Sequence, residues 1–142
     1  MIVPDANLLI YAYDSTSEHH RAARTWWEET LSGSMPVGVP WIVVLAFTRL
    51  MTHPTLSNNP MTTAQARRAV DAWLAQGQVR LLSPTSITFS MFFDLLDAAG
   101  TGGNLSSDAM IAALAVEHGG RVYTNDIDFD RFPNVGWSNP LA

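Results

Sequence analysis

The segment spanning residues 104–130 constrains the fold of this chain most strongly, because it predicts a helix followed at once by a strand. Apolar residues recur at helical spacing, and Ser106 or Ser107 is placed to cap the helix. Glycines at 119–120 end the helix where positive φ is needed. A short strand is expected at 121–124. In an α/β fold, the start of such a helix and the end of its strand lie at one edge of the sheet.

Carboxylates stand at both of these positions. Asp108 begins the predicted helix, and Asp126 and Asp128 follow the strand. Asp5 follows the first predicted strand, so we expect it at the same edge, although alone it fits a simple N-cap equally well. Converging carboxylates repel each other unless a cation lies between them, and hard oxygen ligands suit Mg²⁺ or Mn²⁺. The sequence therefore predicts a divalent metal site, which could polarise a phosphodiester and activate water.

Short strands alternate with helices along the whole chain, which favours an α/β fold with a mainly parallel sheet. The other strands are expected at 1–4, 36–40, 79–82 and 135–137, and the other helices at 8–13, 15–31, 41–51, 62–76 and 86–98. With 142 residues, 47% of them hydrophobic, the chain is long enough for one core and too short for two ordinary domains. We expect a single domain, 1–142.

The absence of cysteine excludes disulfides, zinc–thiolate sites and iron–sulfur clusters. It also suits a reducing cytoplasm. The first residues show no basic export signal, and no apolar run approaches the roughly 18–20 residues that cross a bilayer. We therefore expect a cytoplasmic protein that does not enter a membrane.

The formal net charge of −5 argues at first against a nucleic-acid partner. However, four of the 13 acidic residues belong to the predicted metal site, where bound cations would offset them. The basic residues are eight arginines and no lysine, a usage that fits GC-rich coding as well as phosphate binding. Arg49 ends the apolar segment 41–51, where it either pairs with an acid or contacts a phosphate.

Three acidic motifs stand in order along the chain: Asp5-Ala6-Asn7, Asn104-Leu105-Ser106-Ser107-Asp108-Ala109 and Thr124-Asn125-Asp126-Ile127-Asp128-Phe129. Each motif alone is weak, but together, at these separations, they resemble the PIN-domain ribonucleases, especially the VapC-type toxins of bacterial toxin–antitoxin modules. The resemblance covers essentially the whole chain. It implies a PIN-like three-layer α/β/α sandwich and a metal-dependent endoribonuclease that cuts structured RNA such as tRNA or rRNA. It also implies a homodimer held inactive by a cognate antitoxin.

Carried over residue by residue, Asp5, Asp108 and Asp126 match the catalytic, metal-binding acids of that family. Asp128 matches a frequent fourth ligand of the Mg²⁺ or Mn²⁺ ion. We expect Asn7 and Thr124 to orient the carboxylates, which metal sites require of neighbouring polar groups.

One position departs from the family pattern. Much of the family places a glutamate on the helix after the second strand, and the matching position here is Phe47. The site then holds its metal with fewer acids, recruits another acid such as Asp14, or binds the metal more weakly. Two alternatives to the nuclease follow: a PIN-like binding module whose metal site has decayed, and a phosphatase or phosphotransfer domain with Asp5 as nucleophile. The second alternative normally needs a lysine, which the chain lacks.

Overall fold

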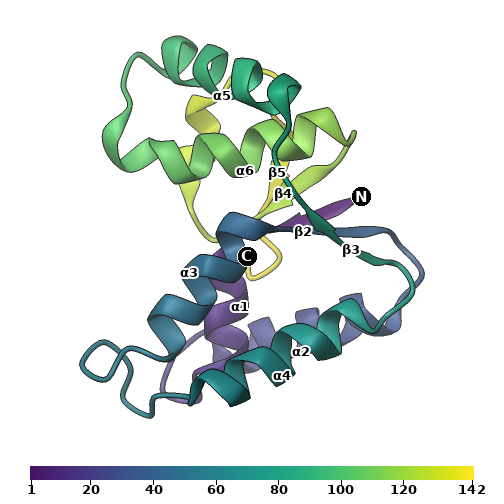
Figure 1. Ribbon diagram of the computed structural model, residues 1–142, viewed down its shortest axis with the longest axis vertical. Helices are drawn as coiled ribbons and strands as arrows, with labels where there is room; N and C mark the ends of the chain where they lie inside the picture. The colour runs from purple at the N-terminus through teal and green to yellow at the C-terminus, as the bar shows by residue number, and fades with distance from the viewer.

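The computed structural model describes all 142 residues and is built on a five-stranded sheet with the strand order β3-β2-β1-β4-β5 (Figure 1). Every neighbouring pair of strands is parallel, so all carboxyl ends lie along one edge of the sheet. The strands are β1 (Ile2–Pro4), β2 (Val37–Pro40), β3 (Val79–Leu82), β4 (Arg121–Tyr123) and β5 (Trp137–Ser138). The predicted α/β class with a parallel sheet is confirmed.

Helices cover both faces of this sheet. They are α1 (Ala6–Tyr13), α2 (His20–Ser32), α3 (Trp41–Met51), α4 (Thr63–Leu74), α5 (Ser86–Ala99) and α6 (Ser106–Glu117), with short 3₁₀ helices η1 (Gly103–Leu105) and η2 (Ile127–Arg131). Helices α5 and α6 lie on one side, and α1, α2 and α4 lie on the other (Figure 1). Helix α3 contacts both α1 and α6. This arrangement is the three-layer sandwich predicted from the family resemblance.

The core forms where the short strands are buried on both faces. Val3, Val37, Val39 and Val122 are fully buried, as expected for parallel strands covered by helices. Helix α6 is buried continuously from Ile111 to Ala115, so its backbone is held firmly against the sheet and α5. The carboxyl edge of the sheet and the start of α6 are therefore rigidly placed relative to each other.

Several helix boundaries follow the local signals in the sequence. Helix α3 spans the predicted residues, and Thr62 caps α4 in a capping box with Gln65. Gly119 adopts φ +64° directly after α6, as the predicted helix stop requires. No helix is both long enough and apolar enough to span a membrane.

Three helix starts differ from the prediction by two or more residues. Helix α1 begins at Ala6 rather than at residue 8, because Asp5 caps it. Helix α6 begins at Ser106 rather than Asp108, because η1 runs directly into it, and no side chain caps it. Helix α2 begins at His20 rather than Ser15. Asp14 Oδ1 accepts hydrogen bonds from the backbone N–H and the hydroxyl of Thr16, at 3.0 and 2.6 Å, and this turn delays the helix.

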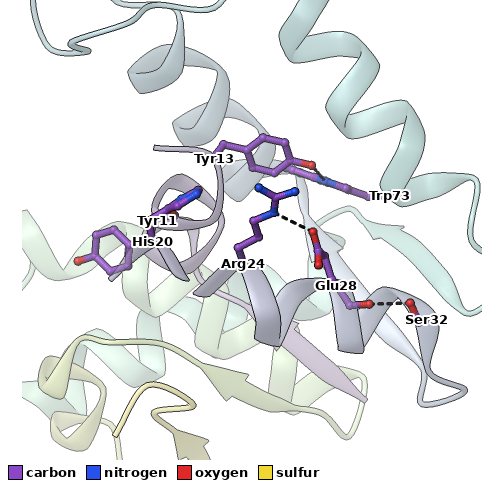
Figure 2. Close-up of polar contacts among 7 residues, drawn as sticks. All are labelled: Tyr11, Tyr13, His20, Arg24, Glu28, Ser32 and Trp73. Atoms are coloured by element: carbon purple, nitrogen blue, oxygen red, sulfur yellow. Dashed lines mark hydrogen bonds and ion pairs between the residues drawn. The ribbon is translucent and has the colours of Figure 1, made fainter. Parts of the chain in front are cut away.

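An aromatic cluster fills the space between α1, α2, α3 and α4. Phe47 packs edge-on against Trp73, with ring centroids 4.9 Å apart, and lies 5.4 Å from the ring of Tyr13. Trp27 meets Trp73 edge-on at 5.7 Å, so Trp27 also serves packing. Figure 2 shows Trp73 Nε1 donating to the Tyr13 hydroxyl, at 2.8 Å. Phe47 is thus part of the core on this side of the sheet.

Candidate metal centre

Three carboxylates meet at the carboxyl edge of the sheet. Asp108 lies in the first turn of α6, while Asp126 and Asp128 follow β4 at the start of η2. One oxygen from each lies within 4.8 Å of the others. Asp108 and Asp126 are partly buried and Asp128 is exposed, so the cluster is open to solvent on one side.

Asp5 lies beside this cluster but is already engaged by the protein. It caps α1, with Oδ1 accepting from the Ala6 N–H at 2.7 Å, and Oδ2 accepts from the Thr124 hydroxyl at 2.7 Å. Its side chain is 8% exposed, and it does not belong to the group of three clustered carboxylates. The N-cap interpretation of Asp5 therefore holds. Each of its oxygens still has a second lone pair, which leaves it able to bind an ion as well.

The electrostatics of the cluster favour a bound cation. Burial, followed by the negative charges of Asp5, Asp126 and Asp128, raises the pKa of Asp108 to about 7. Burial also raises the pKa of Asp5, although hydrogen bonds from Thr124 and Ala6 oppose that shift. A cation among these groups would replace the proton and relieve the repulsion. The donor set consists of carboxylate oxygens alone and therefore fits a hard divalent ion such as Mg²⁺ or Mn²⁺.

The metal-free protein should lose thermal stability as the pH rises through about 7. The Asp108 carboxyl ionises near 3.8 in its unperturbed state and near 7 in the folded protein. Between these values the folded state holds a proton that the unfolded chain has released, so this group stabilises the fold less as the pH increases. We expect melting temperatures in EDTA to fall between pH 5 and pH 8, with a smaller fall in Asp108→Asn. Equal slopes for the two proteins would contradict this assignment.

Thr124 connects the residues around the cluster. It is fully buried, and its hydroxyl donates to Asp5 while accepting from the Asp126 N–H at 2.9 Å and from Asn7 Nδ2 at 3.3 Å. Asn7 Oδ1 also accepts from the Asn125 N–H, at 3.4 Å. Thr124 and Asn7 thus occupy positions from which they can orient Asp5 and Asp126, and their functional roles stay predictions.

The remaining candidates lie away from these carboxylates. Phe47 belongs to the aromatic cluster described above, and Asp14 lies at the end of α1 opposite to Asp5, bonded to Thr16. Asp14 is therefore not recruited in place of the missing glutamate. Arg49 is exposed and forms no ion pair within the chain, so of its two predicted roles the internal pairing is absent.

Sequence reasoning misses one polar contact near the site. Asn139, directly after β5, donates from Nδ2 to Asn125 Oδ1 at 2.9 Å, and Asn125 immediately precedes Asp126. The contact arises because β5 pairs with β4, which brings together residues 14 positions apart. No local sequence pattern signals it.

The fold and the site together define a class of protein, a parallel α/β sandwich with acidic side chains gathered at the carboxyl edge of its sheet. Comparisons with known proteins assign the chain to a family. A family model described as PIN domain matches residues 2–135. Ribonuclease VapC37 of Mycobacterium tuberculosis is 42% identical over 142 residues, covering 100% of this chain and 99% of that protein. The chain therefore belongs to the PIN domain family, within its VapC ribonucleases.

Solved structures show the same fold. The M. tuberculosis toxin VapC20, described as cleaving the sarcin–ricin loop, matches with a TM-score of 0.70 at 18% identity. The match covers 95% of this chain and 98% of the VapC20 chain. A toxin–antitoxin complex from Klebsiella pneumoniae has a TM-score of 0.70 at 16% identity, with 99% and 98% covered. At these identities the likeness concerns the fold.

Proposed function

We propose that this protein is a metal-dependent endoribonuclease and the toxin of a toxin–antitoxin module. The observation that carries the proposal is the meeting of three carboxylates within 4.8 Å at the carboxyl edge of the sheet. In this proposal Asp5, Asp108 and Asp126 are the catalytic, metal-holding acids. Asp128, more exposed, binds more weakly or through water.

In this proposal the residues around the site have different roles in metal binding and positioning. A bound Mg²⁺ or Mn²⁺ ion would polarise the scissile phosphodiester and lower the pKa of water. Asp108 and Asp126, with Asp5 beside them, would hold one such ion, and the Asp128 oxygen lies close enough to share it. Thr124 would keep Asp5 and the backbone of Asp126 in fixed relative positions.

The proposed substrate is structured RNA such as tRNA or rRNA. The sarcin–ricin loop, which the description of VapC20 names as its target, supports this class of substrate, because VapC20 has the same fold. Arg49 supports it too, because an exposed guanidinium without an internal partner is free to contact a phosphate. Recognition would depend on RNA shape and a few side chains around the site.

We also propose two protein partners, a cognate antitoxin and a second copy of this chain. The Klebsiella toxin–antitoxin complex of the same fold supports the first. Large exposed apolar side chains on α3 and α5 support protein contacts in general, because exposed apolar side chains that lie together mark interaction sites. They are Trp41, Leu45, Ile87, Phe89 and Phe93, each 48 to 65% exposed. The exposed rings of Phe89 and Phe93 lie 5.1 Å apart. We also propose that the protein consists of a single domain and acts in the cytoplasm.

The proposal is tested by incubating purified, antitoxin-free protein with total cellular RNA in Mg²⁺ or Mn²⁺. We expect a discrete cut that disappears with EDTA and in Asp5→Asn. Cleavage that persists in EDTA, or at full rate in Asp5→Asn, would contradict the proposed site. Sequencing the new RNA ends would identify the target.

A second candidate is a PIN-like binding module that no longer cleaves RNA. It is favoured by Phe47, which leaves no acid on α3, and by Asp5, whose two oxygens already accept hydrogen bonds. Folded protein that binds no Mn²⁺ and cuts no RNA would favour this candidate. The phosphotransfer alternative gains no support, because Asp5 is buried and bonded at both oxygens.

A further inference from the structure

The turn that carries Asp126 and Asp128 lies between β4 and the buried Phe129, and hydrogen bonds set the position of the part that follows β4. Two of these bonds are internal: the Asp126 N–H donates to Thr124 Oγ1 at 2.9 Å, and the Asp128 N–H donates to Asp126 Oδ1 at 2.9 Å. They shape the turn, and Phe129, fully buried in the core, anchors its far end. The near end, at Asn125, is anchored by hydrogen bonds to residues outside the turn.

Asn125 supplies two such anchors. Its N–H donates to Asn7 Oδ1 on α1 at 3.4 Å, and its side-chain Oδ1 accepts from Asn139 Nδ2 at 2.9 Å. The second bond is the shorter, and it is partly buried. Asn139 therefore ties the chain's C-terminal segment to the residue that directly precedes Asp126.

Asn139 is itself held in place. Its Oδ1 accepts from the Leu141 N–H at 2.9 Å, and the preceding Ser138 carbonyl accepts from the Thr124 N–H at 3.0 Å. Leu141 packs against the hydrophobic core. The Asn139 side chain is thus fixed at its oxygen by Leu141, and its backbone is held beside β4, which allows its Nδ2 to set the position of Asn125.

From these contacts we infer that Asn139 is a positioning residue for the metal centre, acting through Asn125 on the placement of Asp126 and Asp128. The inference rests on the proposed function, since it concerns the same site. Repulsion among the clustered carboxylates tends to push the turn away from Asp108. Asn125 and Asn139 are uncharged and bond to none of these carboxylates, so they restrain the turn without occupying oxygens that an ion would use.

The test measures Mn²⁺ binding to the full-length protein by electron paramagnetic resonance, which does not depend on RNA cleavage. We expect Asn139→Ala to weaken Mn²⁺ affinity by about tenfold, the lower end of the range for groups that orient metal ligands. Asn125→Ala should weaken it similarly. The double variant should be no weaker than Asn125→Ala alone, because both changes remove the same bond.

Ser138→Ala is the matched control, because it removes a different contact of the same segment. Its hydroxyl accepts from Arg121 Nε at 2.6 Å and does not reach Asn125. We expect wild-type Mn²⁺ affinity in this variant, with melting temperatures recorded for all of the proteins. If Asn139→Ala fails to fold, Asn125→Ala provides the same test with the C-terminal segment unchanged.

Three outcomes would overturn the inference, and they can be told apart. Equal Mn²⁺ affinity in wild type, Asn139→Ala and Asn125→Ala would remove the positioning role and leave the proposed function intact. A wild-type protein that binds no Mn²⁺ would overturn the proposed metal-dependent function and the positioning role together. An equal loss of affinity in Ser138→Ala would show a general effect of the C-terminal segment and would also overturn it.

Discussion

Asp108→Asn should abolish RNA cleavage in Mg²⁺ or Mn²⁺ while the protein stays folded. Asp108 lies within 4.8 Å of both Asp126 and Asp128 and carries no hydrogen bond from the rest of the protein that the amide would break. Replacing polar groups that only orient metal ligands commonly costs 10–100-fold, so removal of a ligand itself should cost more than about 100-fold. The rate is measured on the RNA target identified with the wild-type protein.

The stability of this variant separates a functional loss from a structural one. Asp108 is destabilised in its charged form by burial and by neighbouring carboxylates, as its raised pKa shows. The neutral amide removes that repulsion, so at pH 8 the metal-free variant should melt at or above the wild-type temperature. A lower melting temperature would mean that the carboxylate serves the fold, and full cleavage activity would exclude it from the site.

Asp130→Asn provides the matched control. Asp130 lies in η2, two residues beyond Asp128, is exposed, and accepts a hydrogen bond from Trp137 Nε1 at 3.2 Å. An asparagine oxygen can accept the same bond, so the variant removes one nearby negative charge and nothing else. We expect its cleavage rate to remain within about threefold of the wild type, as screened charges at this exposure have small effects. A large loss would indicate that net charge matters more than ligand identity.

Asp5→Asn is a less direct test of the metal site than Asp108→Asn. Both Asp5 oxygens accept hydrogen bonds, one from the Ala6 N–H and one from the Thr124 hydroxyl. An amide can offer an acceptor to only one of these groups, so the variant changes the bond to Ala6 or the bond to Thr124 as well as the charge. Its loss of activity must therefore be read together with its melting temperature.

Much of the fold follows from local sequence signals. The continuous apolar run of α3, the capping box at Thr62 and the stop at Gly119 each act over a few residues, and each predicts a boundary that the structure confirms. The meeting of Asp108 and Asp126 also follows from order alone, since a helix start and the end of a parallel strand share one edge of the sheet.

Features that depend on side-chain bonds between distant segments are not predictable in the same way. The late start of α2 results from the hydrogen bond between Asp14 and Thr16. This bond holds residues 14–16 in a turn and competes with the earlier helix start that their sequence favours. The bond from Asn139 to Asn125 exists only because β5 pairs with β4. Likewise, the helical pattern shows that Phe47 is buried, but not that its neighbours are aromatic rings instead of carboxylates.

Phe47→Glu should severely destabilise the fold and should not add a ligand to the metal centre. Phe47 is fully buried between the rings of Tyr13 and Trp73. Truncating a buried phenylalanine to alanine costs about 3–5 kcal/mol, and a carboxyl group without a partner at this position adds a further cost. Since small domains have unfolding free energies of about 5–15 kcal/mol, we expect the variant to be largely or wholly unfolded. Urea denaturation followed by circular dichroism measures the change.

Phe47→Leu distinguishes loss of packing from the effect of the charge. Leucine remains apolar and fills much of the same volume, so we expect a fall of about 1–2 kcal/mol in the free energy of unfolding and unchanged Mn²⁺ affinity. If Phe47→Glu instead folded stably and bound a second Mn²⁺ ion, the side chain at this position would face the carboxylates, contrary to the packing seen here. Unfolding of Phe47→Glu with a folded Phe47→Leu would mean that this position serves the aromatic core, so that the proposed metal centre consists of Asp5, Asp108, Asp126 and Asp128 without an acid from α3.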